Sequence, residues 1–464
     1  MKKHAILNRF IATLLIVALI LATVGCKSAN VADNENTPEL EHMVSPDRTL
    51  FVGETLTIAE MFNTRELRFV ANKYMRENPG VTIEVIDYFG DYERDGHLLE
   101  VQKLIASQLM AGSGPVLIEA ALADYLDPRS ATFFCDWYPV MAADPGFGEE
   151  DWFMNVFHAV SVNGRLTAFP IHFIYSFIAA NSTIPGLPEA MAGKDGITMS
   201  EMMELHREMQ GETAYSFEPF FDLTWIRELY IDSFINLETG WVDINNERFI
   251  ELITYAERIT DRDISGSIHS SGYQRTEASW SERYFFYITN PIQYQHLVDF
   301  EESLLFSGNT PLVNDLGELV MYPTQGYILS VNATPTEQAL AWDFLKFMME
   351  PDNYQISYYG SMQPTNRNIL RFTVEEKLPS DIRDNNWRLT GTANEAAEDL
   401  IAKMTAFGEM PMHNMRSLPD AIIGMPAGVF PEAMRQFQDG LVSAEQTALN
   451  LQNQVELVLM EISR

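Results

Sequence analysis

The sequence has very few cysteines, only Cys26 and Cys135 in 464 residues. So few thiols exclude a disulfide framework and a cysteine-rich zinc or iron–sulfur site. The nine histidines are scattered, without the His-x-x-x-His or Glu-x-x-His spacing on a helix that binds a transition metal. An Asp-x-Asp-x-Asp-Gly calcium loop is also missing. We therefore expect neither a metal nor a cofactor.

Basic residues are scarce as well. Lysine and arginine number 31 against 65 aspartates and glutamates, which gives a formal net charge of −34. A nucleic-acid partner requires a basic face, which would have to stand out against this acidic background, so we expect no nucleic-acid partner. The apolar content of 46% and charged content of 21% are ordinary for a globular protein, and the length suits two or three domains.

The first 25 residues contain no acidic side chain and have the pattern of an export signal. Lys2, Lys3 and Arg9 precede a continuous apolar run from Phe10 to Ala22. The run is shorter than the about 20 residues of a membrane-spanning helix but fits the apolar region of a signal peptide. No later segment resembles a membrane span.

The apolar run ends in Thr23-Val24-Gly25-Cys26, which resembles a bacterial lipobox. The resemblance implies cleavage before Cys26, lipid attachment to its thiol, and a location on the outer face of a bacterial cell membrane. The alternative is an ordinary secretory signal with a chance cysteine. The polar residues up to position 49 are expected to be a flexible tether. Cys135, left without a partner, is expected to be a buried thiol.

Strand and helix patterns alternate at the start of the mature chain. Residues 55–59 and 81–86 have strand patterns, and residues 64–77 between them have helical spacing, so we expect a βαβ unit with parallel strands. A helix over 100–110 and a strand over 116–118 follow. The glycine-rich residues between them come after a helix and before a strand, which is the wrong order for a phosphate-binding loop.

The rest of the chain continues the α/β pattern with many aromatic residues. We expect helices over 199–210, 246–259 and 336–349, a strand over 327–331, and a mostly helical tail over 395–464.

Five segments together resemble family 1 of the extracellular solute-binding proteins, the sugar-type binding proteins of ABC importers. They are Glu77–Gly80, Gln108–Pro115, Asn163–Pro170, Gln325–Ile328 with Ala341–Phe347, and Gln363–Arg367. The sequence departs from the family at two positions. Val116 replaces an aspartate, and Ile174 stands where maltose-type members have a carboxylate at the hinge.

The resemblance implies an α/β fold of the type II periplasmic-binding-protein kind, with two lobes of parallel-rich sheets flanked by helices. Residues 1–25 would be the signal and 26–49 the lipidated tether. Lobe 1 would contain 50–170 plus 327–375, and lobe 2 would contain 171–326 plus 376–464. Hinge crossings are expected near Pro170–His172 and Gln325–Tyr327, with the ligand between the lobes.

A sugar offers hydroxyls at its rim and apolar faces, so its site needs polar side chains and aromatic planes. The resemblance and this chemistry give nine candidate ligand contacts: Glu60, Asn63, Glu119, His172, Tyr175, Trp225, Trp241, Tyr294 and Tyr327. Each aromatic among them has a plain alternative as a core residue, as Trp342 is expected to be. Glu60 could instead be an acid at a helix start, and His172 a hydrogen-bonded hinge residue.

These observations predict a monomeric binding protein that delivers a carbohydrate to a membrane permease, and not an enzyme. The sequence has no Gly-x-Ser-x-Gly motif, and Cys135 has no local signature of a nucleophile. Three alternatives stay open. The ligand could be a polyamine or peptide, the protein could be a sensor or adhesion module of the same fold, or it could hydrolyse a surface glycan.

Overall fold

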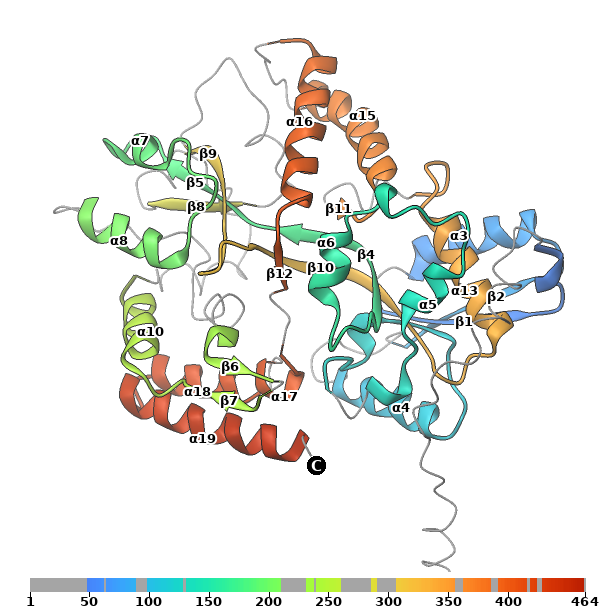
Figure 1. Cartoon of the computed structure of the whole chain (residues 1–464), viewed down its shortest axis with the longest axis horizontal. Helices are drawn as coiled ribbons and strands as arrows, with labels where there is room; N and C mark the ends of the chain where they lie inside the picture. The colour runs from blue at the N-terminus through green and yellow to red at the C-terminus, as the bar shows by residue number, and fades with distance from the viewer. Residues whose placement is uncertain are drawn as a thin grey trace, which may run out of the picture.

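A computed structural model describes residues 48–61, 64–88, 98–127, 131–209, 231–237, 239–259, 285–289, 306–354, 362–384, 391–414, 418–423 and 428–462 (Figure 1). The predictions for Cys26, Asn63, Trp225 and Tyr294 lie outside these residues.

The first elements form the predicted βαβ unit. Strand β1 (Thr55–Glu60) pairs in parallel with β2 (Thr82–Asp87), and helix α3 (Thr64–Glu77) connects them. The helix buries Leu67, Val70, Ala71 and Tyr74, which recur at the three- and four-residue spacing of one helix face. Its apolar stripe explains why this segment is helical and why it covers the sheet.

The next pair of elements also agrees with the sequence pattern. Helix α4 (Leu98–Met110) precedes β3 (Leu117–Glu119), and β3 pairs in parallel with β1. The helix ends at Gly112, whose φ of 71° is the left-handed conformation that favours glycine after a helix. The glycine-rich segment is therefore a helix stop.

The main sheet has seven strands in the order β11-β4-β10-β3-β1-β2, with β12 paired to β10. Its long central strands are β4 (Ala168–Tyr175) and β10 (Leu319–Leu329), which pair antiparallel with each other. The short strands β11 (Gln363–Pro364) and β12 (Met412–Asn414) complete it. The sheet is thus mixed, with parallel pairing confined to β1, β2, β3 and the β10–β12 pair.

The chain between β4 and β10 forms two smaller sheets. Strands β5 (Phe177–Asn181), β8 (Phe286–Thr289) and β9 (Phe306–Pro311) form an antiparallel sheet with β5 in the middle. Strands β6 (Ile235–Asn236) and β7 (Trp241–Val242) form a short hairpin.

The remaining elements are helical. They are η1 (Arg48–Phe51), η2 (Ala120–Leu122), η3 (Ala131–Phe133), α5 (Trp137–Ala142), η4 (Glu149–Asp151), α6 (Met154–Val160), α7 (Leu187–Met191), α8 (Met199–Met209), η5 (Ile231–Phe234), α10 (Glu247–Ile259), α13 (Pro335–Met348), α15 (Arg367–Asp384), α16 (Ala393–Gly408), α17 (Asp420–Ile423), α18 (Val429–Gln438) and α19 (Ala444–Ile462).

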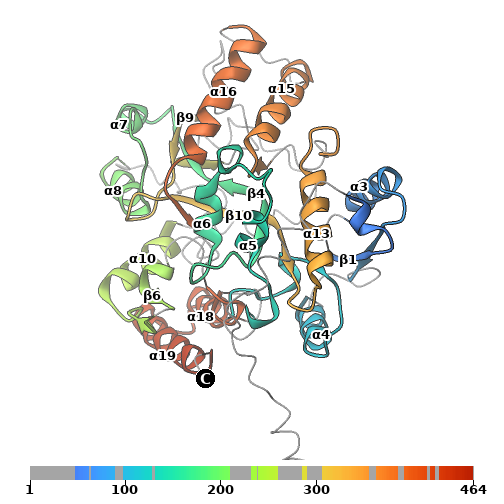
Figure 2. The same cartoon turned by 45° about the vertical axis from the view of Figure 1, so that its right-hand side comes forward.

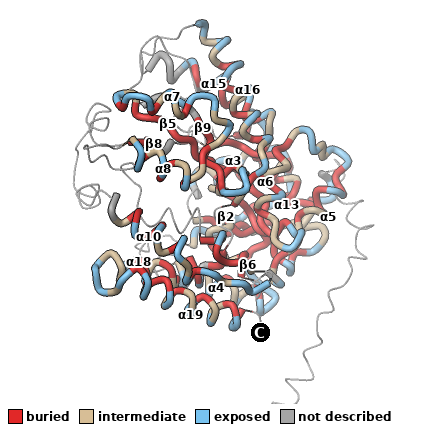
Figure 3. Tube along the Cα trace, turned by 60° about the vertical axis from the view of Figure 1, so that its left-hand side comes forward, coloured by how far each residue is buried: buried red, intermediate tan, exposed pale blue. Residues whose placement is uncertain are grey.

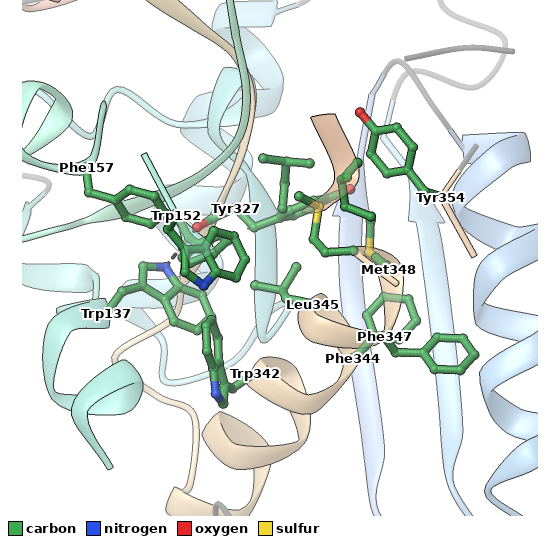
Figure 4. Packing of buried hydrophobic residues seen from close by; sticks show 14 of the residues in the cluster. Trp137, Trp152, Phe157, Tyr327, Trp342, Phe344, Leu345, Phe347, Met348 and Tyr354 are labelled. Atoms are coloured by element: carbon green, nitrogen blue, oxygen red, sulfur yellow. Dashed lines mark hydrogen bonds between the residues drawn. The ribbon is translucent and has the colours of Figure 1, made fainter. Parts of the chain in front are cut away.

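Buried apolar residues separate into two large clusters and a smaller one. The first core packs β1, β2, β4 and β10 against α3, α5, α6, α13, α15 and α16. Its centre is aromatic, with Trp137, Trp152 and Trp342 close together (Figure 4). The second core joins β5 and β8 to α8, α10, α18 and α19. The third packs α4 on the opposite face of β1, β3 and β10. Figure 3 shows burial concentrated along the strands and exposure along the outer helix faces.

Three stretches of chain connect the first core to the second. The first is β4 into β5, where Phe177 belongs to the first core and Ile178 to the second. The second is β9 into β10. The third is β12 into α17, where Met412 and Leu418 lie in different cores. Figures 1 and 2 show β4 and β10 running through the middle of the molecule. They lie between two bodies, which are the parts of the chain built around the first core and around the second core.

The predicted crossings at Pro170–His172 and Gln325–Tyr327 face each other in this fold. Pro170 pairs with Gly326 and His172 with Gln325, in the middle of the β4–β10 ladder. A Cβ atom on Gly326 would lie 2.9 Å from the Phe169 carbonyl oxygen, so this close approach of strands requires glycine.

Helix α16 packs in the first core, through Leu400 and Met404 among others. The family resemblance places these residues in lobe 2, and the precise limits of the lobes stay a prediction. Among the described residues, none of the helices combines the length and the hydrophobicity that crossing a bilayer requires.

Candidate functional site

Two carboxylates lie side by side where β1 and β3 end. The parallel register pairs Ala59 with Ile118, so the next residues, Glu60 and Glu119, are neighbours on adjacent strands. Both are buried, with 0% and 2% of their surfaces exposed. Glu119 accepts a hydrogen bond of 2.7 Å from the backbone N–H of Met61. The carboxyl ends of parallel strands are where open α/β sheets bind ligands.

Strand β10 adds two polar side chains to this end of the sheet. Tyr327 pairs with Glu119 in the antiparallel register, and its hydroxyl donates to Glu60 Oε2 at 2.9 Å. Gln325 Nε2 in turn donates to the Tyr327 hydroxyl at 3.2 Å. Both side chains are buried. The structure therefore brings three of the predicted contacts, Glu60, Glu119 and Tyr327, into one polar cluster.

His172 lies on β4 opposite Gln325. Its ring is fully buried, and Nε2 forms a hydrogen bond with the Tyr354 hydroxyl. Burial lowers the pKa of His172 to about 3, and the nearby Gln325 side chain only partly opposes this. The imidazole is therefore neutral in the folded protein and acts as a hydrogen-bonding group.

The other predicted contacts within the described residues lie in different surroundings. Tyr175 is buried in the first core, with its ring centroid 5.4 Å from that of Phe407. Trp241 is 49% exposed on the short β6–β7 hairpin, beside α19. Ile174 is buried in β4 and pairs with Tyr322. The structure does not bring Tyr175 or Trp241 into the Glu60 cluster.

Two residues of this polar region were not predicted from the sequence. They are Gln325, which donates to Tyr327, and Tyr354, which forms a hydrogen bond with His172. Gln325 had a detectable signal, because it is a buried amide in a strand of mainly apolar residues. Tyr354 had none, since it follows helix α13 and meets His172 only in the folded chain.

Cys135 is partly buried against the first core, less than the fully buried thiol that was expected. Burial raises its pKa to about 11, with the nearby Arg165 lowering it less than burial raises it. A thiol in this state is mainly protonated at neutral pH and is a poor nucleophile. The described part of the chain contains no group of three histidine, cysteine or acidic side chains able to hold a metal ion.

Comparison with known proteins identifies the fold. No family model matches the sequence, and no curated protein matches it. Solved structures do. The sugar-binding protein MalE of Xanthomonas citri has a TM-score of 0.58 at 14% identity, over 88% of this chain and 98% of its own. Maltose-bound MalE3 of T. maritima has a TM-score of 0.52 at 15% identity, over 87% and 99%.

A periplasmic oligogalacturonide-binding protein of Yersinia enterocolitica is similar to the same extent. Its TM-score is 0.54 at 13% identity, over 88% of this chain and all of its own. These neighbours are two-lobe periplasmic binding proteins, so the predicted fold class is confirmed.

Proposed function

We propose that the protein is an extracellular solute-binding protein that captures a carbohydrate between its two lobes and delivers it to an ABC permease. The observation that carries the proposal is the buried polar cluster of Glu60, Glu119 and Tyr327 at the strand ends of a periplasmic-binding-protein fold. Ligands of open α/β sheets bind at such ends. The solved neighbours that bind maltose or oligogalacturonides support a carbohydrate ligand.

The two carboxylates bear on which sugars would bind. Carboxylate oxygens accept hydrogen bonds from hydroxyl and ammonium groups, whereas they repel an acidic sugar. We therefore rank neutral and amine-bearing saccharides above galacturonides for this chain. The remaining predicted contacts, His172, Tyr175 and Trp241 together with Asn63, Trp225 and Tyr294, stay candidates within this proposal.

The experiment is thermal unfolding of the purified protein with a panel of saccharides, polyamines and oligopeptides. A ligand that binds only the folded state raises the melting temperature in a saturable way. We expect a rise with a neutral or amine-bearing saccharide that is recovered unchanged. The rise should be smaller in Glu60→Gln, which still binds but more weakly, and be kept in Glu84→Gln, which changes an exposed acid on β2.

Other results would redirect the proposal. A rise with polyamines or peptides alone would keep the solute-binding role and exclude sugar. Turnover of an oligosaccharide would identify a hydrolase. No rise with any compound would contradict solute capture and favour a sensor or adhesion module.

We also propose that Cys26 carries a lipid that anchors the protein to the outer face of the cell membrane. The support is the lipobox-like sequence from Thr23 to Cys26 behind an apolar run. Incorporation of labelled palmitate should be seen in the natural chain and lost in Cys26→Ala. Labelling that survives this substitution would contradict the anchor.

A further inference from the structure

Glu60 is held by a chain of hydrogen bonds that begins on the crossing strand β10. Gln325 Nε2 donates to the Tyr327 hydroxyl at 3.2 Å, and that hydroxyl donates to Glu60 Oε2 at 2.9 Å. All three side chains are buried. This series of hydrogen bonds therefore starts on β10, a strand that lies between the two bodies. It ends at the Glu60 carboxylate, at the end of β1.

The ring of Tyr327 packs among the apolar side chains of the first core. Glu60 is equally buried but is the last residue of β1, at the strand end where the proposed site lies. The Tyr327 backbone carbonyl accepts a hydrogen bond of 2.9 Å from Trp137 Nε1, which fixes the strand beneath the ring (Figure 4). With the ring enclosed and the backbone anchored, the hydroxyl has a defined direction, and that direction is toward Glu60.

The neighbouring carboxylate explains why Glu60 would need such a donor. Glu60 and Glu119 are adjacent on parallel strands, so two buried acidic side chains both need hydrogen-bond donors at this strand end. Hydrogen bonds to a charged acceptor are stronger than those between neutral groups. A donated hydrogen bond from Tyr327 keeps Glu60 in one orientation despite the adjacent Glu119.

We propose that Tyr327 and Gln325 are positioning residues, which orient the Glu60 carboxylate for the ligand and do not touch the ligand themselves. This inference rests on the proposed function, in which Glu60 contacts the ligand. It changes the role that the sequence analysis gave to Tyr327, from ligand contact to support of a contact.

The test is a double-mutant cycle on affinity, measured by calorimetry with the saccharide that raises the melting temperature most. Tyr327→Phe should weaken binding about tenfold in the natural chain, since it removes one hydrogen bond to a charged group. In the Glu60→Gln background the same substitution should change affinity by less than about twofold, because Tyr327 acts through Glu60.

Tyr74→Phe is the matched control. Tyr74 is also a fully buried tyrosine of the first core, and its hydroxyl donates to a carboxylate, Asp343 Oδ2, at 2.6 Å. It should lower the melting temperature to a similar degree and leave affinity unchanged. Equal losses of affinity in Tyr74→Phe and Tyr327→Phe would overturn the positioning role, as would a loss in Tyr327→Phe that persists in Glu60→Gln.

A readout without ligand separates this inference from the proposed function. Infrared spectra of protein labelled with ¹³C at glutamate carboxylates should show a shifted carboxylate band in Tyr327→Phe, and no such shift in the Glu60→Gln background. If no saccharide binds the natural protein, the proposed function fails while this spectral shift still tests the hydrogen bond. An unchanged spectrum would overturn the inference whatever the ligand result.

Discussion

At the scale of single residues, tight contacts and buried polar groups are the features that most constrain this protein. Gly408 ends helix α16 against the ring of Phe153, which is itself fully buried. His172 is enclosed between β10 and Tyr354. At either position an added or altered side chain has no access to water and must fit among its neighbours. A substitution there should therefore change the stability measurably.

Gly408→Ala should destabilise the protein. A Cβ atom at this position would overlap the aromatic ring of Phe153, which has no space to move because it is buried in the first core. Overpacking of this kind costs about 1–3 kcal/mol, more than the about 1 kcal/mol that alanine gains over glycine in a helix. Urea unfolding measures the difference. The loss should be smaller when Gly408→Ala is introduced together with Phe153→Leu, and an equal loss in both backgrounds would contradict the steric cause.

Because His172 stays neutral in the folded protein, the protein should be less stable in mild acid than at neutral pH. Its folded pKa of about 3 lies below the value of about 6.5 for a solvated histidine. Between these values the unfolded chain binds a proton that the folded chain does not. The free energy of unfolding should therefore fall as pH decreases through this window, by up to about 1.4 kcal/mol per pH unit, and be fully retained above pH 6.5.

His172→Gln should flatten this dependence between about pH 6.5 and 4.5 in urea titrations. The control is His158→Gln, at an exposed position on α6. Equal slopes in the natural chain and in His172→Gln would show that another group titrates with unfolding in this range.

At the scale of elements, sequence patterns located the first three strands and several helices but gave no expectation for β4, β5 or α15. The βαβ unit was predictable because α3 has a clear apolar stripe and the strands flank it directly. The strand expected over 327–331 proved to be the last part of β10, which begins at Leu319. Its first half was missed because the Tyr-Pro-Thr-Gln stretch at 322–325 interrupts the apolar pattern.

The tail shows what local pattern could not predict. It was expected to be mostly helical, and α16, α18 and α19 are helices. Strand β12 within it was missed because its three residues form a strand only by pairing with β10, about a hundred residues earlier in the chain. The Glu60 cluster was predicted in part, since strand ends are visible in sequence. Its hydrogen bonds to Tyr327 and Gln325 depend on which strands become neighbours.

Helix α13 should depend on its N-terminal cap. Thr334 accepts a hydrogen bond from the Glu337 backbone N–H, and Glu337 accepts one of 2.7 Å from the Thr334 backbone N–H. This capping box starts a helix that places Trp342 in the first core. Thr334→Ala should cost about 1 kcal/mol of stability in urea unfolding, whereas Thr334→Ser should cost only a few tenths. Similar losses in both variants would contradict the capping role.

At the scale of the whole molecule, two separate cores are connected by three stretches of chain. β4 and β10 pair within the first core, and the chain continues from them toward the second core, so we expect these connections to bend without unpacking either core. Such an architecture favours movement of one body against the other as a rigid unit.

A bound ligand should therefore make the protein more compact. A solute that contacts both bodies stabilises the closed arrangement by its difference in affinity between the closed and open forms. Small-angle X-ray scattering should show a radius of gyration that falls as saccharide is added and stops falling when calorimetry shows saturation. Glu60→Gln at the same saccharide concentration should stay closer to the ligand-free value, and Glu84→Gln should follow the natural chain. Saturable binding with a constant radius would mean that the ligand occupies one body alone. In that case closure could not be the signal that a permease recognises.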